Sequence, residues 1–196
     1  MLPVFMIKKN RKISTLENET YLKVQTWFFS YPNSEISLSD LSKRVRISKT
    51  TANKVVLHLE KEGFLKKAVL GKMWWISCNQ NHFYNYSRKI AYNLEMIYKS
   101  KVLELIHSAV KSPRAIILFG SYRKGDDNER SDVDIAVEIL GDEELRIIKL
   151  GTMPHFGYRY DVPVNIHIFS RNKIDLNLFA NIANGIVLEG FLEVRP

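Results

Sequence analysis

The sequence predicts an α+β protein with two folded parts of unequal size, joined by helices. Three observations lead to this expectation. Signals for three helices and a hairpin fill residues 16–78. Residues 79–111 contain neither glycine nor proline and repeat apolar side chains at helical spacing, and strand-like apolar runs follow from residue 115 onward. A chain of 196 residues, 45% of them apolar, is long enough for two small domains with packed cores.

The first part contains recognisable helix boundaries. A helix over 17–30 ends at a turn-forming Tyr-Pro-Asn-Ser segment. Ser39 is expected to cap a short second helix, and Ser48 a third helix over 49–62. Two strand-like stretches then flank Gly-Lys, which predicts a hairpin with a basic tip over 64–77.

This order of elements resembles the winged helix-turn-helix family. The resemblance is carried by residues 38–45, 48–64 and the hairpin that follows them. It implies that the helix 49–62 enters the major groove of double-stranded DNA and that the hairpin reaches phosphates. A winged helix used only for dimerisation or other protein contacts is the alternative. The residues expected to contact DNA are Lys49, Thr50, Asn53, Lys54, His58, Lys66, Lys67 and Lys72.

The connector is predicted to form one long helix or two consecutive helices that end before Ser112-Pro113. It could mediate a homodimer, as could the first domain, or pack onto the domain that follows. The expected boundaries are an N-terminal extension at 1–15, a first domain at 16–78, the connector at 79–112 and a second domain at 113–196.

The most informative stretch begins with a glycine-serine turn after an apolar run. Gly120 permits a close approach to a ligand, and Ser121 offers a hydroxyl at the start of an expected helix. Ten residues later, Ser131 precedes Asp132 and Asp134, which point to the same face of a strand because side chains alternate. Two such carboxylates crowd negative charge, and hard oxygen ligands suit Mg²⁺.

The Gly-Ser and Asp-x-Asp pattern over roughly residues 114–192 resembles the DNA polymerase beta superfamily of nucleotidyltransferases, and within it the minimal nucleotidyltransferases. The resemblance implies a mixed sheet flanked by helices, with Mg²⁺ or Mn²⁺ as cofactor and an NTP as substrate or ligand. Asp132 and Asp134 would be the catalytic and metal-binding pair. The residues expected to bind the nucleotide are Gly120, Ser121, Arg123, Lys124 and Ser131.

This sequence departs from the family pattern at the third metal-binding carboxylate. Asn165, on a strand predicted over 162–169, occupies the best-matching position and would be a neutral metal ligand. His167 lies on the same face and is the candidate general base. Asp161 lies about 13 Å along a strand from Asn165, and Glu138 lies about 13 Å from Asp134. Neither could replace the missing carboxylate without a bulge.

Composition restricts the partners. The net charge of +8 favours nucleic acid or nucleotide. The single cysteine, Cys78, excludes an internal disulfide and suits a reducing compartment. The first residues do not form a signal peptide, and no apolar run is long enough to span a membrane, so we expect a cytoplasmic protein without membrane contacts.

These observations predict a Mg²⁺-dependent nucleotidyltransferase that transfers NMP from an NTP to an unknown hydroxyl acceptor and is tethered to a DNA-binding domain. Because the third carboxylate is missing, a DNA-binding regulator is the alternative. In such a regulator the second domain would sense nucleotide with little or no catalysis. A component of a toxin–antitoxin system is a further alternative, since some minimal nucleotidyltransferases belong to such systems.

Overall fold

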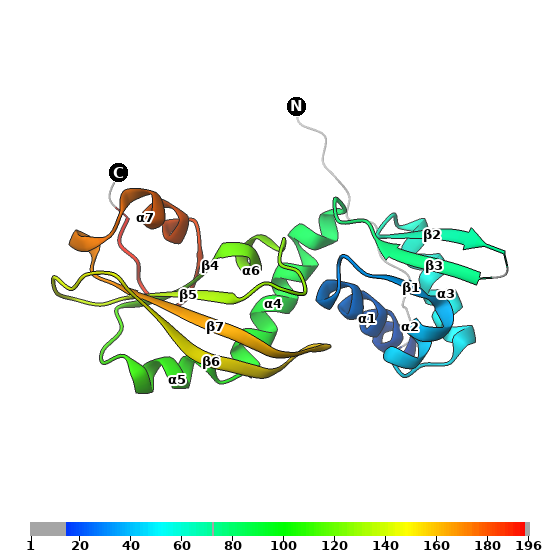
Figure 1. The fold of residues 1–196 in the computed structure, drawn as a ribbon, viewed down its shortest axis with the longest axis horizontal. Coiled ribbons are helices and arrows are strands. Elements are labelled where there is room, and N and C mark those ends of the chain that lie inside the picture. The colour runs from blue at the N-terminus through cyan, green and yellow to red at the C-terminus, as the bar shows by residue number, and fades with distance from the viewer. Residues whose placement is uncertain (1–14, 72, 195–196) are drawn as a thin grey trace, which may run out of the picture.

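The computed structural model describes residues 15–71 and 73–194. The expected N-terminal extension lies outside this part except for its last residue, and so does Lys72, one of the expected DNA contacts. The described chain forms two domains side by side, with a helical connector crossing between them (Figure 1). Within the described ranges, no helix is both long and apolar enough to cross a bilayer.

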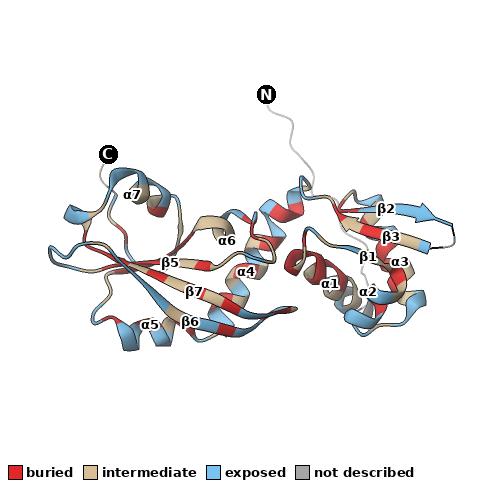
Figure 2. Ribbon diagram, in the orientation of Figure 1, coloured by how far each residue is buried: buried red, intermediate tan, exposed pale blue. Residues whose placement is uncertain are grey.

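Residues 15–71 and 73–78 form three helices and a three-stranded antiparallel sheet of strand order β1-β3-β2. Figure 2 shows buried residues where the helices face one another. The core includes Phe28 of the first helix and Ala52, Val56 and Leu59 of the third, all fully buried. The elements are α1 (Thr15–Ser30), β1 (Glu35–Ser37), α2 (Leu38–Arg44), α3 (Lys49–Lys61), β2 (Leu65–Leu70) and β3 (Met73–Cys78).

The predicted cap of α3 is confirmed, and that of α2 is wrong. The Ser48 hydroxyl accepts the N–H of Thr51 at 3.0 Å. In α2 the capping residue is Ser37, which accepts the N–H of Asp40, so Ser39 lies inside the helix. The sequence offers two serines two residues apart. Strand β1 (Glu35–Ser37), which was not predicted, pairs with β3. This pairing leaves Ser37 extended at the point where the helix begins, so Ser37 rather than Ser39 becomes the cap.

The connector forms two consecutive helices, one of the two arrangements that the sequence allows. A short 3-10 helix (Phe83–Tyr86) leads into α4 (Arg88–Lys99), and Lys101 in a left-handed conformation separates it from α5 (Val102–Ala109). The ring of Tyr92 in α4 packs against Phe29 of the first domain and Phe156 of the second, both at 5.9 Å. Helix α4 therefore belongs to the cores of both domains.

Residues 115–190 form a mixed five-stranded sheet of order β6-β7-β5-β4-β8. Strands β5 and β7 are parallel and the other neighbours are antiparallel. Helix α5 covers one face of the sheet and α7 the other (Figure 1). This arrangement agrees with the expected mixed sheet flanked by helices. The elements are β4 (Ala115–Phe119), α6 (Gly120–Lys124), β5 (Val133–Glu138), β6 (Arg146–Phe156), β7 (Arg159–Phe169), a 3-10 helix (Arg171–Lys173), α7 (Leu176–Ala183) and β8 (Ile186–Gly190).

Strand β6 was not predicted, and β7 begins three residues earlier than expected. Strand β6 lies at the edge of the sheet and is largely exposed (Figure 2). Its hydrophobic pattern is weak because only one edge pairs and few side chains are buried. The strand contains Pro154, which has no N–H, and a register shift between Lys149 and Gly151; edge strands tolerate both because their outer N–H groups face solvent.

A buried ion pair attaches the loop after α6 to the connector. Lys89 of α4 is 1% exposed and Asp127 is 4% exposed, with 3.3 Å between Nζ and Oδ2. The Asn93 amide donates to the same carboxylate at 2.8 Å. Desolvation raises the pKa of Asp127 and lowers the pKa of Lys89, opposed in each case by their mutual attraction.

Gly125 brings this loop against the connector backbone. Its φ is +78°, and a Cβ there would lie 1.8 Å from the carbonyl oxygen of Asn85. Only glycine accommodates both the conformation and the contact. The segment between α6 and β5 is thus held at Gly125 and at Asp127.

Replacing Lys89 with methionine should lower the free energy of unfolding by about 3 kcal/mol, because Asp127 then stays buried with an unmatched charge. Adding Asp127→Asn should recover most of the loss, since the remaining side chain is neutral. Urea denaturation followed by circular dichroism measures both effects.

The matched control is Lys99→Met, which removes an exposed partner of Glu95 from the same helix and should leave the unfolding free energy nearly unchanged. A Lys89→Met variant as stable as this control would contradict the account of the buried pair.

Candidate active site

The glycine-serine turn lies directly beside the second aspartate. Phe119, the last residue of β4, pairs with Asp134 of β5, and the chain then turns at Gly120 into α6. Gly120 has φ +72°, and a Cβ there would lie 3.1 Å from Oδ2 of Asp134. This position therefore requires glycine for its conformation, and any side chain would crowd the carboxylate.

Both aspartates face the same amide. The parallel register of β5 and β7 pairs Asp134 with Asn165. Asn165 Nδ2 lies 3.3 Å from Oδ2 of Asp132 and 3.4 Å from Oδ1 of Asp134. The structure thus brings together the three residues predicted to bind metal, although Asp132 lies just before β5 rather than within it.

His167 lies next to this group. Its Nε2 is 3.4 Å from Oδ1 of Asp134, and its ring meets Phe119 edge-on at 4.9 Å between centroids. Its Nδ1 is buried and has no hydrogen-bond partner among the described residues. Because a carboxylate oxygen accepts hydrogen bonds, we place a proton on Nε2, where it can be donated to Asp134.

Glu138 cannot complete the acid set. It is 1% exposed at the far end of β5 and forms ion pairs with Arg171 at 3.1 Å and Arg114 at 3.8 Å. Within the described residues, no group of three or more histidine, cysteine, aspartate or glutamate side chains is placed to hold a metal ion. The side chains placed to hold an ion are two carboxylates, Asp132 and Asp134, and the amide of Asn165.

This donor set is compatible with Mg²⁺. Magnesium binds through one or two protein carboxylates and takes its other ligands from water and substrate phosphates. Asp132 and Asp134 provide two such carboxylates at one point. A nucleotide would have to supply further ligands, which is the arrangement found where metal and triphosphate bind together.

Residues 100–189 match the family described as polymerase beta nucleotidyltransferase. The matched segment runs from the start of α5 through most of β8 and contains Gly120, Ser121, Asp132 and Asp134. The match supports the predicted resemblance of this segment to nucleotidyltransferases. No curated protein matches the chain.

Ser131 supports the loop that precedes Asp132 from within. Its hydroxyl accepts the N–H of Asn128 at 3.0 Å, and its carbonyl accepts from Arg159 at 2.9 Å. Arg159 is buried and also donates to the hydroxyl of Tyr122. The sequence offers no signal for this role of Arg159, because a charged residue at a strand end is ordinarily solvated.

The other expected nucleotide contacts lie on α6. Ser121 is partly exposed and follows Gly120 directly. Arg123 and Lys124 lie in the last turn, and neither forms an ion pair with another described residue. Their charges are therefore not neutralised within the described chain.

The expected DNA contacts of the first domain fall into two groups. Lys49, Thr50, Lys54 and Lys66 are exposed, and Asn53 is partly exposed. Lys49 and Asn53 line a hollow of about 480 Å³ that Trp74 also borders.

Two other expected DNA contacts are engaged within the chain. His58 lies 3.5 Å from Glu62 and edge-on to Tyr21, whereas Lys67 lies 3.0 Å from Glu60 and over the ring of Trp74. An outer-face pattern alone does not distinguish these contacts from free side chains.

Replacing Asn165 with aspartate should make the thermal stability of the protein depend on bound metal. A third carboxylate beside Asp132 and Asp134 should lower the melting temperature in chelator and strengthen Mn²⁺ binding by at least about tenfold, because affinity rises with ligand charge. Thermal denaturation with and without Mn²⁺ and isothermal titration calorimetry measure these changes.

Asn172→Asp makes the same charge change at an exposed position and should alter neither quantity. Equal Mn²⁺ affinity for the Asn165→Asp variant and this control would show that residue 165 is not at a metal site.

Proposed function

We propose that the C-terminal domain is a nucleotidyltransferase that transfers a nucleoside monophosphate from an NTP to a hydroxyl group of an acceptor and releases pyrophosphate. The observation that carries the proposal is the placement of Asp132 and Asp134 around one amide, beside Gly120, where a Cβ would lie only 3.1 Å from Oδ2 of Asp134. The family match over residues 100–189 supports it.

Asp132, Asp134 and the amide oxygen of Asn165 would hold Mg²⁺ or Mn²⁺. When bound, the ion would neutralise triphosphate charge and lower the pKa of a coordinated hydroxyl. The backbone at Gly120 and the Ser121 hydroxyl would orient the phosphates, and Arg123 and Lys124 would add positive charge from the other end of α6. Ser131 would act by shaping the loop before Asp132, since its hydroxyl accepts a backbone N–H.

His167 would position Asp134 rather than remove a proton from the acceptor. The Nε2 atom of His167 faces Oδ1 of Asp134, and its Nδ1 is buried. Asn165 is not a base either. A site without a general base favours the second candidate, a DNA-binding regulator that senses nucleotide with weak or no turnover.

We further propose that the first domain is a winged helix-turn-helix that binds double-stranded DNA. The helix–strand–helix–helix–hairpin order, the polar face of α3 and the net charge of +8 support this. Helix α3 would enter the major groove. The side chains available for contact are Lys49, Thr50, Asn53, Lys54 and Lys66. With nucleic acid and NTP as ligands, the protein would act in the cytoplasm.

Incubation with each α-labelled NTP, Mn²⁺ and acceptors that include tRNA, cell lysate and the protein itself tests the enzyme. Label transfer should occur, and it should fall by at least about 10³-fold in the Asp132→Ala/Asp134→Ala variant, because transition-state charge loses its stabilisation. The matched control, Asp142→Ala/Glu144→Ala, removes two exposed carboxylates near Lys173 and should transfer label normally.

NTP binding without transfer, lost in the aspartate variant, would support the regulator instead. NTP binding that survives loss of both aspartates would contradict the assignment of the metal site to Asp132 and Asp134.

Binding of the protein to a random DNA duplex should weaken steeply with salt. Replacing Lys49 and Lys54 with alanine should reduce the slope of log affinity against log salt by about 1.8, since each lost phosphate contact removes about 0.9. Fluorescence anisotropy measures the slope. Lys99→Ala/Lys111→Ala removes two lysines outside the first domain, and an equal change in that control would argue against α3 as the DNA contact.

A further inference from the structure

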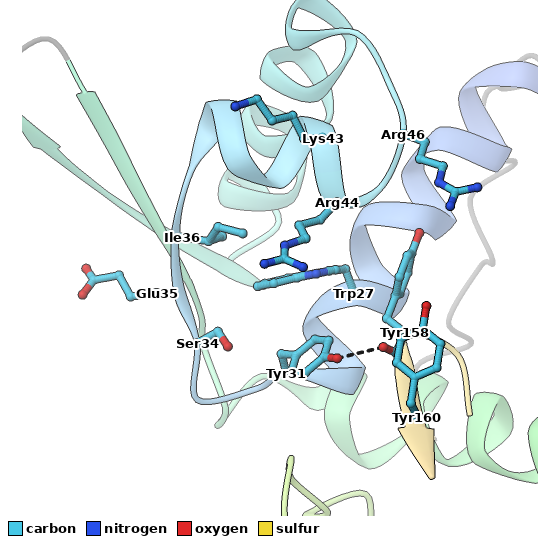
Figure 3. A pocket seen from close by; sticks show the side chains of 10 residues that line it. All are labelled: Trp27, Tyr31, Ser34, Glu35, Ile36, Lys43, Arg44, Arg46, Tyr158 and Tyr160. Carbon is cyan, nitrogen blue, oxygen red and sulfur yellow. Dashed lines mark hydrogen bonds between the residues drawn. The ribbon is translucent and has the colours of Figure 1, made fainter. Parts of the chain in front are cut away.

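A hollow of about 500 Å³ lies where the tip of the β6–β7 hairpin meets the first domain (Figure 3). One wall comes from Trp27 of α1, Arg44 at the end of α2 and Arg46 in the loop that follows α2. The other wall comes from the hairpin, with Tyr158 and Tyr160. The hollow combines aromatic rings with cationic side chains, and neither proposed function uses it.

The two walls are fixed to each other. The hydroxyl of Tyr31 donates to the carbonyl of Tyr158 at 2.7 Å, the contact drawn in Figure 3. The N–H of Tyr158 lies 3.3 Å from the Ser30 hydroxyl. The hairpin tip is therefore attached to the end of α1, and a ligand in the hollow would touch both domains.

The charge of the hollow is positive. Lys43, Arg44 and Arg46 line it, and Glu35 is its one lining carboxylate. In the described chain, neither Arg44 nor Arg46 takes part in an ion pair, while Lys43 is 3.7 Å from Asp40. Free guanidinium groups with their fork of donors suit phosphate oxygens.

The aromatic lining includes one ring that is open to solvent. Tyr160 is 69% exposed and meets His155 edge-on at 5.0 Å, which orients the ring on the hairpin. Trp27 and Tyr31 pack against each other at 5.3 Å and form a more buried part of the wall. An exposed aromatic ring beside unpaired arginines offers a stacking surface next to a phosphate site.

We propose that this hollow between the domains binds single-stranded nucleic acid, with a base stacked on Tyr160 and backbone phosphates bound by Arg44 and Arg46. A duplex fits this surface poorly, because its bases are already stacked and show no free face to a tyrosine ring. This site is separate from the polar face of α3 and from the pair Asp132 and Asp134. A strand bound there would strengthen the attachment of the hairpin to the first domain.

Anisotropy of a labelled oligothymidylate of about ten nucleotides tests the proposal on the full-length protein. Tyr160→Ala should weaken binding by about tenfold without changing the salt slope, since it removes stacking and no charge. Tyr160→Phe keeps the ring and should bind like the wild type. Arg44→Ala/Arg46→Ala should reduce the salt slope by about 1.4, at about 0.7 for each phosphate contact in a single strand.

Lys49→Ala/Lys54→Ala should leave oligothymidylate binding unchanged, which separates this site from the duplex site proposed for α3. Wild-type affinity in the Tyr160→Ala variant would overturn the proposal. So would competition by a duplex, a polyglutamate or thymidine monophosphate as effective as competition by unlabelled oligothymidylate, because each lacks either a free base face or a continuous strand.

Discussion

The repulsion between Asp132 and Asp134 is the constraint around which the second domain is arranged. The two carboxylates approach the same amide nitrogen, so their like charges lie close enough to repel each other. In the structure a neutral amide, that of Asn165, donates toward both carboxylates, and the Nε2 atom of His167 approaches one of them. These groups reduce the repulsion and leave a net negative site, which a divalent cation would complete.

Keeping the two carboxylates together depends on segments far from them in sequence. The loop before Asp132 is attached to α4 by the buried pair of Lys89 and Asp127, and Ser131 is held by Arg159 at the start of β7. Helix α4 also contributes Tyr92 to contacts with both domains. The connector therefore holds the loop before Asp132 through Lys89 and joins the two domains through Tyr92.

Short sequence motifs predicted those parts of the site that depend on residues close together in the chain. The glycine-serine turn and the spacing of the aspartates predicted a phosphate-binding turn beside an acid pair, and the family resemblance placed Asn165 at the third metal-ligand position. In the structure Gly120 lies beside Asp134, and Asn165 lies against both carboxylates. What the sequence could not show depends on tertiary burial. A lysine in a polar helix gives no sign that it will be 1% exposed, as Lys89 is, and edge strand β6 has too few buried residues for a clear pattern. Arg159 gains its role only when the start of β7 packs against Tyr122 and Ser131, and the hollow beside Tyr160 forms only where the hairpin meets the first domain.

The most direct test of the central claim is anomalous diffraction from crystals grown with Mn²⁺ and a non-hydrolysable NTP analogue. The account predicts one strong manganese peak within coordination distance of carboxylate oxygens from both Asp132 and Asp134, with the oxygen of the Asn165 amide turned toward it and the triphosphate beside Gly120 and Ser121. An ordered nucleotide with no manganese peak at these two carboxylates would contradict it.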